Sequence, residues 1–147
     1  MAKSINDKDF QDCLKRGKIK KFSKAKSLIP KELESAKSDL KTSQDSLKRK
    51  NYKWATIQAY YSMFHTARTL IYSKGYRERS HYCLIVALKQ LFVAEQLLDV
   101  RLIEAMQMAK TLRENADYDN EFSKSSAEAL VEKAQSFLNK CEELLER

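Results

Sequence analysis

Glycine and proline are scarce in this 147-residue sequence, which contains two glycines and one proline. Because these two residues supply most tight turns, a chain with so few of them is poorly suited to a sheet of many strands. Lysine, glutamate, leucine and alanine are abundant instead, and all four are strong helix formers. The composition therefore predicts long helices joined by few turns.

Long apolar runs are also absent, since no stretch approaches the roughly eighteen consecutive apolar residues of a membrane-spanning helix. The first ten residues, MAKSINDKDF, lack the apolar centre of a secretory signal peptide. We therefore expect a cytoplasmic protein that has no membrane partner.

Sites for metals and cofactors are missing as well. The cysteines Cys13, Cys83 and Cys141 have spacings that match neither a zinc site nor a redox pair, so we expect reduced thiols. The sequence contains no glycine-rich phosphate loop, no nucleophile elbow and no HExxH pair. Neither His65 nor His81 belongs to the Glu-x-x-His pair of a di-metal bundle. We expect no metal and no cofactor.

Positive charge is concentrated near the amino terminus. The formal net charge is +8, and residues 1–29 contribute +6 of it, with nine basic and three acidic side chains. Such a basic arm can bind phosphates, because binding releases counterions. It can equally be a solvated flank, and the charge alone leaves both alternatives open.

The most apolar stretch, residues 51–73, predicts a central helix with apolar side chains on two faces. One face consists of Trp54, Ile57, Tyr61, Phe64 and Ile71, and the other of Ala55, Ala59, Met63, Ala67 and Leu70. A polar strip completes its circumference, formed by Gln58, Ser62, His65, Arg68 and Tyr72. A helix that is apolar on two faces needs neighbours on both.

Further apolar patterns predict the helices that surround this one. They cover residues 5–16, 30–50, 81–95, 97–115 and a last segment after a capping box at Ser125 and Glu128. Asn51 and Ser80 are the expected caps of two helices, and the segments between the helices are expected to be loops.

The predicted fold is all-α, an antiparallel up-and-down bundle of four to five long helices with a short amino-terminal helix. We expect a single domain over residues 1–147. Residues 1–29 would form the basic arm with its short helix, and residues 30–147 the helical bundle.

The segment AYYSMFHTARTLIYSKGYRERSHYCLIVALKQLF, followed by LRENADYD, resembles the HEPN family (higher eukaryotes and prokaryotes nucleotide-binding domain). The connector GKIKKF and the helix after Pro30 match the layout of its small prokaryotic branch. The resemblance implies a helical bundle, a homodimer and a separately encoded nucleotidyltransferase partner. It also implies RNA or a nucleotide as a ligand, because many members are RNases or toxins that cut RNA without a metal.

The RNase members carry an arginine followed, after four to six residues, by a histidine. In this chain Arg113 stands at the matching place, but Tyr118 occupies the position after four residues. Tyrosine, with a pKa near about 10, is a poor proton shuttle at neutral pH. The resemblance makes Arg113 and Tyr118 the candidate catalytic pair and loss of RNase activity the first inference. The alternative is a structural ion pair between Arg113 and Asp117, with the Tyr118 ring packed under the next loop.

A second group of candidates precedes the helix expected at residue 81. Arg77, Arg79 and His81, together with Arg113, are the candidate nucleotide-binding or phosphate-binding residues. Free backbone donors at a helix amino end favour anions, which strengthens this interpretation. A hydrated loop is the alternative for both loop arginines. We place the Arg77 and His81 pair away from the family's site.

The polar residues of the central helix have a different expected role. His65 and Arg68 lie on an otherwise apolar helix, where polar groups normally bond to backbone or to a carboxylate of a neighbouring helix. We therefore assign them to a structural polar core.

Two functions follow from these expectations. The first is a HEPN-like binding protein for RNA or a nucleotide, acting with a nucleotidyltransferase in a pair of the toxin-antitoxin type. The alternative is a metal-independent HEPN RNase, or toxin, in which Tyr118 or His81 replaces the usual histidine beside Arg113.

Overall fold

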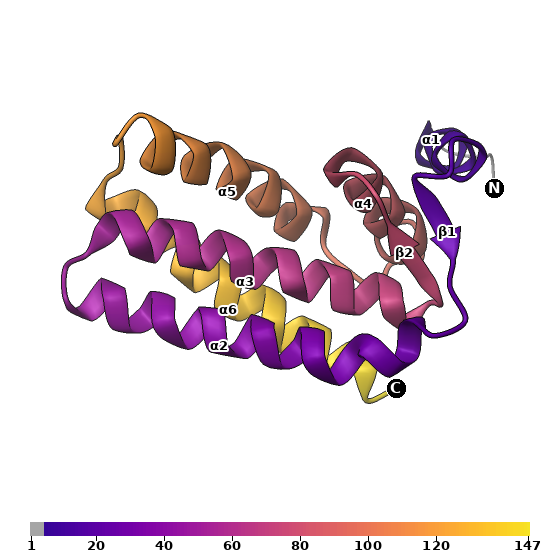
Figure 1. The fold of residues 1–147 in the computed structure, drawn as a ribbon, viewed down its shortest axis with the longest axis horizontal. Coiled ribbons are helices and arrows are strands. Elements are labelled where there is room, and N and C mark those ends of the chain that lie inside the picture. Colours follow the sequence, from indigo (N-terminus) through magenta and orange to yellow (C-terminus); the bar gives the residue numbers. More distant parts are fainter. Residues whose placement is uncertain (1–4) are drawn as a thin grey trace.

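Four long helices lie side by side, and the remaining elements gather beyond one end of them (Figure 1). The computed structural model describes residues 5–147, and side chains from Asp7 onward. The elements are α1 (Ile5–Lys15), β1 (Ile19–Lys21), the 3-10 helix η1 (Ala25–Leu28), α2 (Ile29–Lys48), α3 (Tyr52–Ser73), β2 (Tyr76–Glu78), α4 (His81–Leu88), the π-helical turn η2 (Lys89–Val93), α5 (Val100–Tyr118) and α6 (Lys124–Leu145). The predicted all-α helical bundle is confirmed. None of the helices in the described part of the chain has the length and apolarity that a membrane crossing needs.

Helix α3 occupies the centre and packs against α2, α5 and α6. Its predicted small-residue face is fully buried, at Ala55, Ala59, Met63, Ala67 and Leu70. Small side chains let the backbones of two helices approach closely. The Ser62 hydroxyl accordingly donates a hydrogen bond of 2.8 Å to the backbone carbonyl of Ala36 in α2.

The other predicted face of α3 is only partly covered. Trp54 and Tyr61 are 45% and 41% exposed, so their predicted burial is wrong. Both rings carry a polar atom that can remain hydrated, so apolar spacing did not by itself require them to be inside. This side of α3 is where the candidate site lies.

Side-chain caps begin most of the helices that follow. Asn51 accepts from the amide of Trp54 at 3.5 Å and Ser80 from the amide of Cys83 at 3.1 Å, which confirms both predicted caps. The predicted cap of the last helix is wrong, because Ser123, rather than Ser125, accepts from the amide of Ser126. Ser123 has the extended backbone that a cap requires.

The helix predicted over residues 81–95 is interrupted. Its α-helical part ends at Leu88, and the chain continues as the π-helical turn η2 to Val93. The next helix was predicted from Leu97, but it begins at Val100 because Asp99 caps it by accepting from the amide of Arg101 at 2.9 Å. The uniform apolar spacing carried no signal of this break.

Two segments that were predicted as loops form a small antiparallel ribbon. Strand β1 pairs with β2, with Lys20 opposite Arg77. One further bond extends the pairing at each end, from the amide of Phe22 to the carbonyl of Gly75 and from the amide of Arg79 to the carbonyl of Lys18, both at 2.8 Å. Each strand has three residues and the two are distant in sequence, so no local sequence pattern predicts them.

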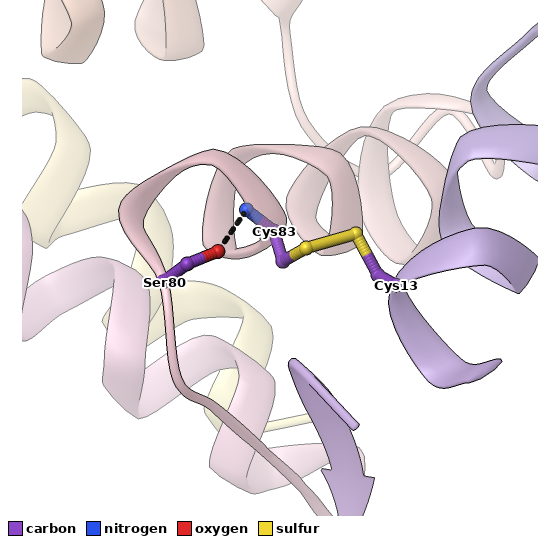
Figure 2. The surroundings of a disulfide bond; sticks show 3 residues. All are labelled: Cys13, Ser80 and Cys83. Carbon is purple, nitrogen blue, oxygen red and sulfur yellow. Dashed lines mark hydrogen bonds between the residues drawn. A yellow bond between two sulfur atoms is a disulfide. The ribbon is translucent and has the colours of Figure 1, made fainter. Parts of the chain in front are cut away.

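A disulfide joins Cys13 in α1 to Cys83 in the first turn of α4 (Figure 2). The prediction of reduced thiols is therefore wrong for these two residues, and it holds only for Cys141, which is free and buried. Burial raises the pKa of the Cys141 thiol to about 12, so this thiol stays protonated. The two bonded cysteines are 70 residues apart, and they meet where α1 packs against α4 beside the paired strands β1 and β2.

Reduction of this disulfide is expected to destabilise the protein. A cross-link across 70 residues removes chain entropy from the unfolded state worth up to about 4 kcal/mol. Urea unfolding with and without dithiothreitol measures the difference. The double variant Cys13→Ser with Cys83→Ser is the control, since reductant should not change its midpoint. Equal midpoints for the oxidised and reduced parent protein would contradict the expectation.

Candidate functional site

Arg113 lies in α5 among three tyrosine rings. Its guanidinium carbon is 5.3 Å from the ring centre of Tyr60, 5.9 Å from that of Tyr61 and 5.8 Å from that of Tyr118. The first two rings come from α3, and Tyr118 is the last residue of α5. The side chain of Arg113 is 13% exposed, so it is held in a defined position with its charge near the surface.

The charge of Arg113 is only partly balanced by carboxylates. Asp117 lies 3.7 Å and Glu114 3.9 Å from its terminal nitrogens, distances too long for strong hydrogen bonds. Burial alone would lower the pKa of Arg113, but its interactions with Tyr118, Tyr61 and Tyr60 raise the pKa above the ordinary value. The guanidinium therefore stays charged and can accept a further anionic partner.

His81 reaches the same place from the first turn of α4. Its ring centre is 6.4 Å from that of Tyr60, the ring that Arg113 also contacts. Burial, together with the positive charges of Lys110 and Arg113, lowers the pKa of His81, although Glu114 opposes this. The imidazole is therefore neutral at pH 7 and able to accept a proton. His81 therefore lies near Arg113, although the sequence placed the pair of Arg77 and His81 at the start of a helix and not at the family's site.

We call Tyr60, Tyr61, His81, Arg113 and Tyr118 the Arg113 cluster. Two of its buried nitrogens, Nδ1 of His81 and Nε of Arg113, have no hydrogen-bond partner in the described part of the chain. Buried polar atoms are nearly always paired, so such exceptions require an explanation. Catalytic groups often lack their partner until a substrate binds.

The structure gives the other predicted site residues different surroundings. The Arg77 guanidinium carbon is 5.1 Å from the ring centre of Phe22, and the Arg79 amide bonds to Lys18, so both arginines belong to the ribbon. Tyr118 is 74% exposed, so its ring is not packed under the following loop as the structural alternative supposed.

Sequence reasoning missed Tyr60 and Tyr61 as site residues. The sequence assigned Tyr61 to an apolar face of the central helix and assigned Tyr60 to neither face. Two adjacent tyrosines on one helix cannot share a face, since successive residues point about 100° apart. One of the two tyrosines therefore had to lie outside the core. The adjacent pair was the sequence feature that could have indicated a site residue.

Comparison with known proteins identifies the family of this chain. The model of the HEPN domain matches residues 30–144, which is most of the chain. The chain belongs to the HEPN family. The match includes the whole Arg113 cluster. It also includes the helices from α2 to α6, except for Ile29 at the start of α2 and Leu145 at the end of α6.

Two proteins of Methanocaldococcus jannaschii are similar to this chain over most of their length. The protein named "Putative toxin MJ0142" is 32% identical over 119 residues, covering 80% of this chain and 81% of that protein. The protein named "Putative toxin MJ0605" is 25% identical over 114 residues, covering 77% of this chain and 85% of that protein.

A polar network farther along α3, toward its carboxyl end, contains His65 and Arg68 in this HEPN chain. Nδ1 of His65 lies 2.7 Å from the Glu32 carboxylate of α2. Arg68 lies 3.4 Å from Glu32 and 3.4 Å from Glu78 of β2, and it donates to the Tyr72 hydroxyl at 2.7 Å. The network thus joins α2, α3 and the ribbon through charged side chains.

The two carboxylates of this network respond differently to their surroundings. Burial raises the pKa of Glu32, but the hydrogen bond with His65 and the charge of Arg68 outweigh it, so the pKa is lowered. Glu78 is more buried and has Arg68 as its main cationic partner, so burial prevails and its pKa is raised. Glu32 is therefore the carboxylate whose ionised form stabilises the fold.

Glu32→Gln is expected to reduce the free energy of unfolding at pH 7 by about 1–3 kcal/mol, the usual value of a charged hydrogen bond. A carboxyl whose folded-state pKa lies below 4.5 contributes stability above that pH, and this is lost as pH falls through the folded value. The variant should therefore lose less stability than the parent between about pH 5 and pH 3. Urea unfolding at both pH values measures this.

Glu143→Gln is the matched control. Glu143 also contacts two cations, Lys140 and Arg147 at 3.3 Å each, but it is 56% exposed. Exposed ion pairs contribute at most about 1 kcal/mol. Equal losses in the two variants would mean that the Glu32 network is no more stabilising than a surface pair.

Proposed function

We propose that this protein is a HEPN toxin that cleaves RNA without a metal, with the Arg113 cluster as its active site. The observation that carries the proposal is the position of His81 beside the same tyrosine ring as Arg113, and burial, which lowers the pKa of His81, favours its neutral form. A proton acceptor next to a fixed cation is the pairing that phosphodiester cleavage by an internal nucleophile requires. The names of the two relatives support the toxin class.

The chemistry assigned to the cluster is transesterification within the RNA. His81 takes the proton of a ribose 2′-hydroxyl, whose oxygen attacks the adjacent phosphorus. Arg113 binds the non-bridging oxygens, where negative charge increases in the transition state. The bond to the 5′-oxygen breaks and that oxygen takes a proton from water, leaving a 2′,3′-cyclic phosphate and a 5′-hydroxyl end. The exposed ring of Tyr118 offers a surface on which a base can stack.

A non-catalytic version of the same site is the second candidate. It is favoured by Tyr118, which stands where RNase members of the family carry the histidine. In this case the protein binds RNA or a nucleotide at Arg113 and acts with a separately encoded nucleotidyltransferase in a pair of the toxin-antitoxin type. Because relatives are named as toxins, an antitoxin partner is consistent with either candidate.

A homodimer is the proposed assembly for both candidates. An apolar groove of about 330 Å³ runs between α5 and α6, lined mainly by Ala105, Met108, Leu112, Ala129 and Leu130. Met108 is 59% exposed there, although methionine is normally buried. Leu112 precedes Arg113, so a second copy seated in this groove would bring a second Arg113 cluster close to the first.

Met108→Glu is expected to shift the protein from dimer to monomer, because a buried carboxylate in an apolar interface costs several kcal/mol. Light scattering after gel filtration measures the mass of each form. Met106→Glu is not a suitable control because Met106 lies in the core, whereas Gln107→Glu changes an exposed neighbour on α5 and should leave the mass unchanged. An unchanged mass for Met108→Glu would contradict the dimer face.

The RNase proposal predicts cleavage of single-stranded RNA in the presence of EDTA. Arg113→Ala should reduce the rate by about 10²–10³-fold, because a transition-state charge contact is lost. His81→Gln should reduce it by about 10²–10⁴-fold through loss of the base. Arg101→Ala is the matched control, since it removes an 80% exposed guanidinium from the same helix and should retain full activity.

The pH dependence of cleavage tests the role of His81 separately. A base acts in its deprotonated form, so the cleavage rate should rise with pH and reach a plateau. The midpoint of the rise should lie below 6.5, the ordinary pKa of histidine. Cleavage that survives Arg113→Ala would point to another site or to a contaminating RNase. RNA binding without any cleavage by the parent protein would favour the second candidate.

A further inference from the structure

The ribbon concentrates positive charge far beyond the average of the chain. Ten basic side chains lie in it and in the segments that flank it, namely Lys15, Arg16, Lys18, Lys20, Lys21, Lys24, Lys26, Lys74, Arg77 and Arg79, with Glu78 as the only carboxylate. Their net charge of +9 exceeds the +8 of the whole chain, so the remaining residues sum to −1. The basic arm and the loop arginines, which are separate in sequence, are one surface in the structure.

The ribbon is built with a repulsive pair. Lys20 lies directly opposite Arg77 in the antiparallel register, and like charges in that position destabilise a sheet. The neighbouring carboxylate, Glu78, points to the other strand face and pairs with Arg68 at 3.4 Å. A like-charge pair that costs stability and lies on the surface suggests that an anion is its partner.

Two cavities beside the ribbon continue this surface. One, of about 770 Å³, is lined by Lys21, Phe22, Ser23, Lys26, Lys74 and Gly75. The second, of about 480 Å³, shares Lys26 and Lys74 with the first and adds Arg147 to its rim. Among the described residues that line these two cavities, none is an aspartate or a glutamate.

The second cavity has an apolar floor beside its cations, lined mainly by Ile29, Leu97 and Leu144, since Phe92 is almost fully buried. The Lys74 ammonium is 5.4 Å from the ring centre of Phe92, at the edge of this floor. A row of cations beside an apolar recess suits an anionic chain that also carries flat apolar groups. Single-stranded RNA has this chemistry, since its phosphates bind cations and its bases leave water on stacking.

We propose that the ribbon and these two cavities form a second RNA-binding surface, which holds single-stranded RNA by its phosphates outside the Arg113 cluster. Lys20 and Arg77 bind the backbone, and the recess beside Leu97 and Leu144 receives a base. A duplex is a poorer ligand, because the major groove of A-form RNA is too narrow for the ribbon and its bases are stacked inside. The inference deepens the proposed function, on which it rests for RNA as the ligand.

The charge repulsion within the ribbon makes the proposal testable. Lys20→Glu converts the repulsive pair with Arg77 into an attractive one, so the melting temperature should stay the same or rise. The same change should weaken RNA binding about tenfold at low salt, because one cation is lost and Arg77 is neutralised. A purely structural role for Lys20 cannot weaken binding while the fold becomes more stable.

Fluorescence anisotropy with a labelled 2′-O-methyl oligouridine, which cannot be cleaved through a 2′-hydroxyl, measures binding alone. The slope of log K against log salt should fall by about 1.4 for two lost phosphate contacts. Lys41→Glu, an equal charge change on the exposed surface of α2, is the control and should leave the slope nearly unchanged.

Equal binding by Lys20→Glu and Lys41→Glu would overturn the proposal. The two proposals fail separately. A protein that binds this RNA through Lys20 but never cleaves cleavable RNA would refute the RNase function and retain the second surface. Cleavage that depends on Arg113 but is unchanged in Lys20→Glu at every salt concentration would support the RNase function and refute the second surface.

Discussion

The burial of α3 is the constraint on which the rest of the structure depends. Its fully buried small side chains, such as Ala59 and Ala67, let α2 and α6 pack closely against it. At about 25 cal/mol per Å² of apolar surface, this face supplies much of the energy that holds the bundle together. Because the close packing fixes the rotation of α3, it also fixes the direction of every side chain on its remaining surface.

That rotation sets two polar regions at successive positions along one helix. Tyr60 and Tyr61 meet Arg113 of α5, whereas His65 and Arg68 meet carboxylates of α2 and β2. Charges in the second region are neutralised within the protein and tie the ribbon to the bundle. The charge of Arg113 is met chiefly by aromatic rings, which leave it available to an external anion.

The sequence predicts those features that depend on local periodicity and capping. The buried face of α3 and the caps at Asn51 and Ser80 follow from spacing and side-chain chemistry, and the family follows from a motif on the same helix. The ribbon, the disulfide and the approach of His81 to Arg113 could not be predicted in this way. Each joins segments distant along the chain, and strands of three residues carry no periodic signal.

The ribbon, the disulfide and the position of His81 are physically connected. Pairing of β1 with β2 carries Cys13 to Cys83, and the resulting bond holds the first turn of α4. His81 stands in that turn, two residues before Cys83, so the position of a proton acceptor depends on a contact made on the far side of the helix. The basic ribbon and the Arg113 cluster are therefore coupled through α4. Loosening the ribbon would disturb His81 before it disturbed Arg113, which α5 holds independently.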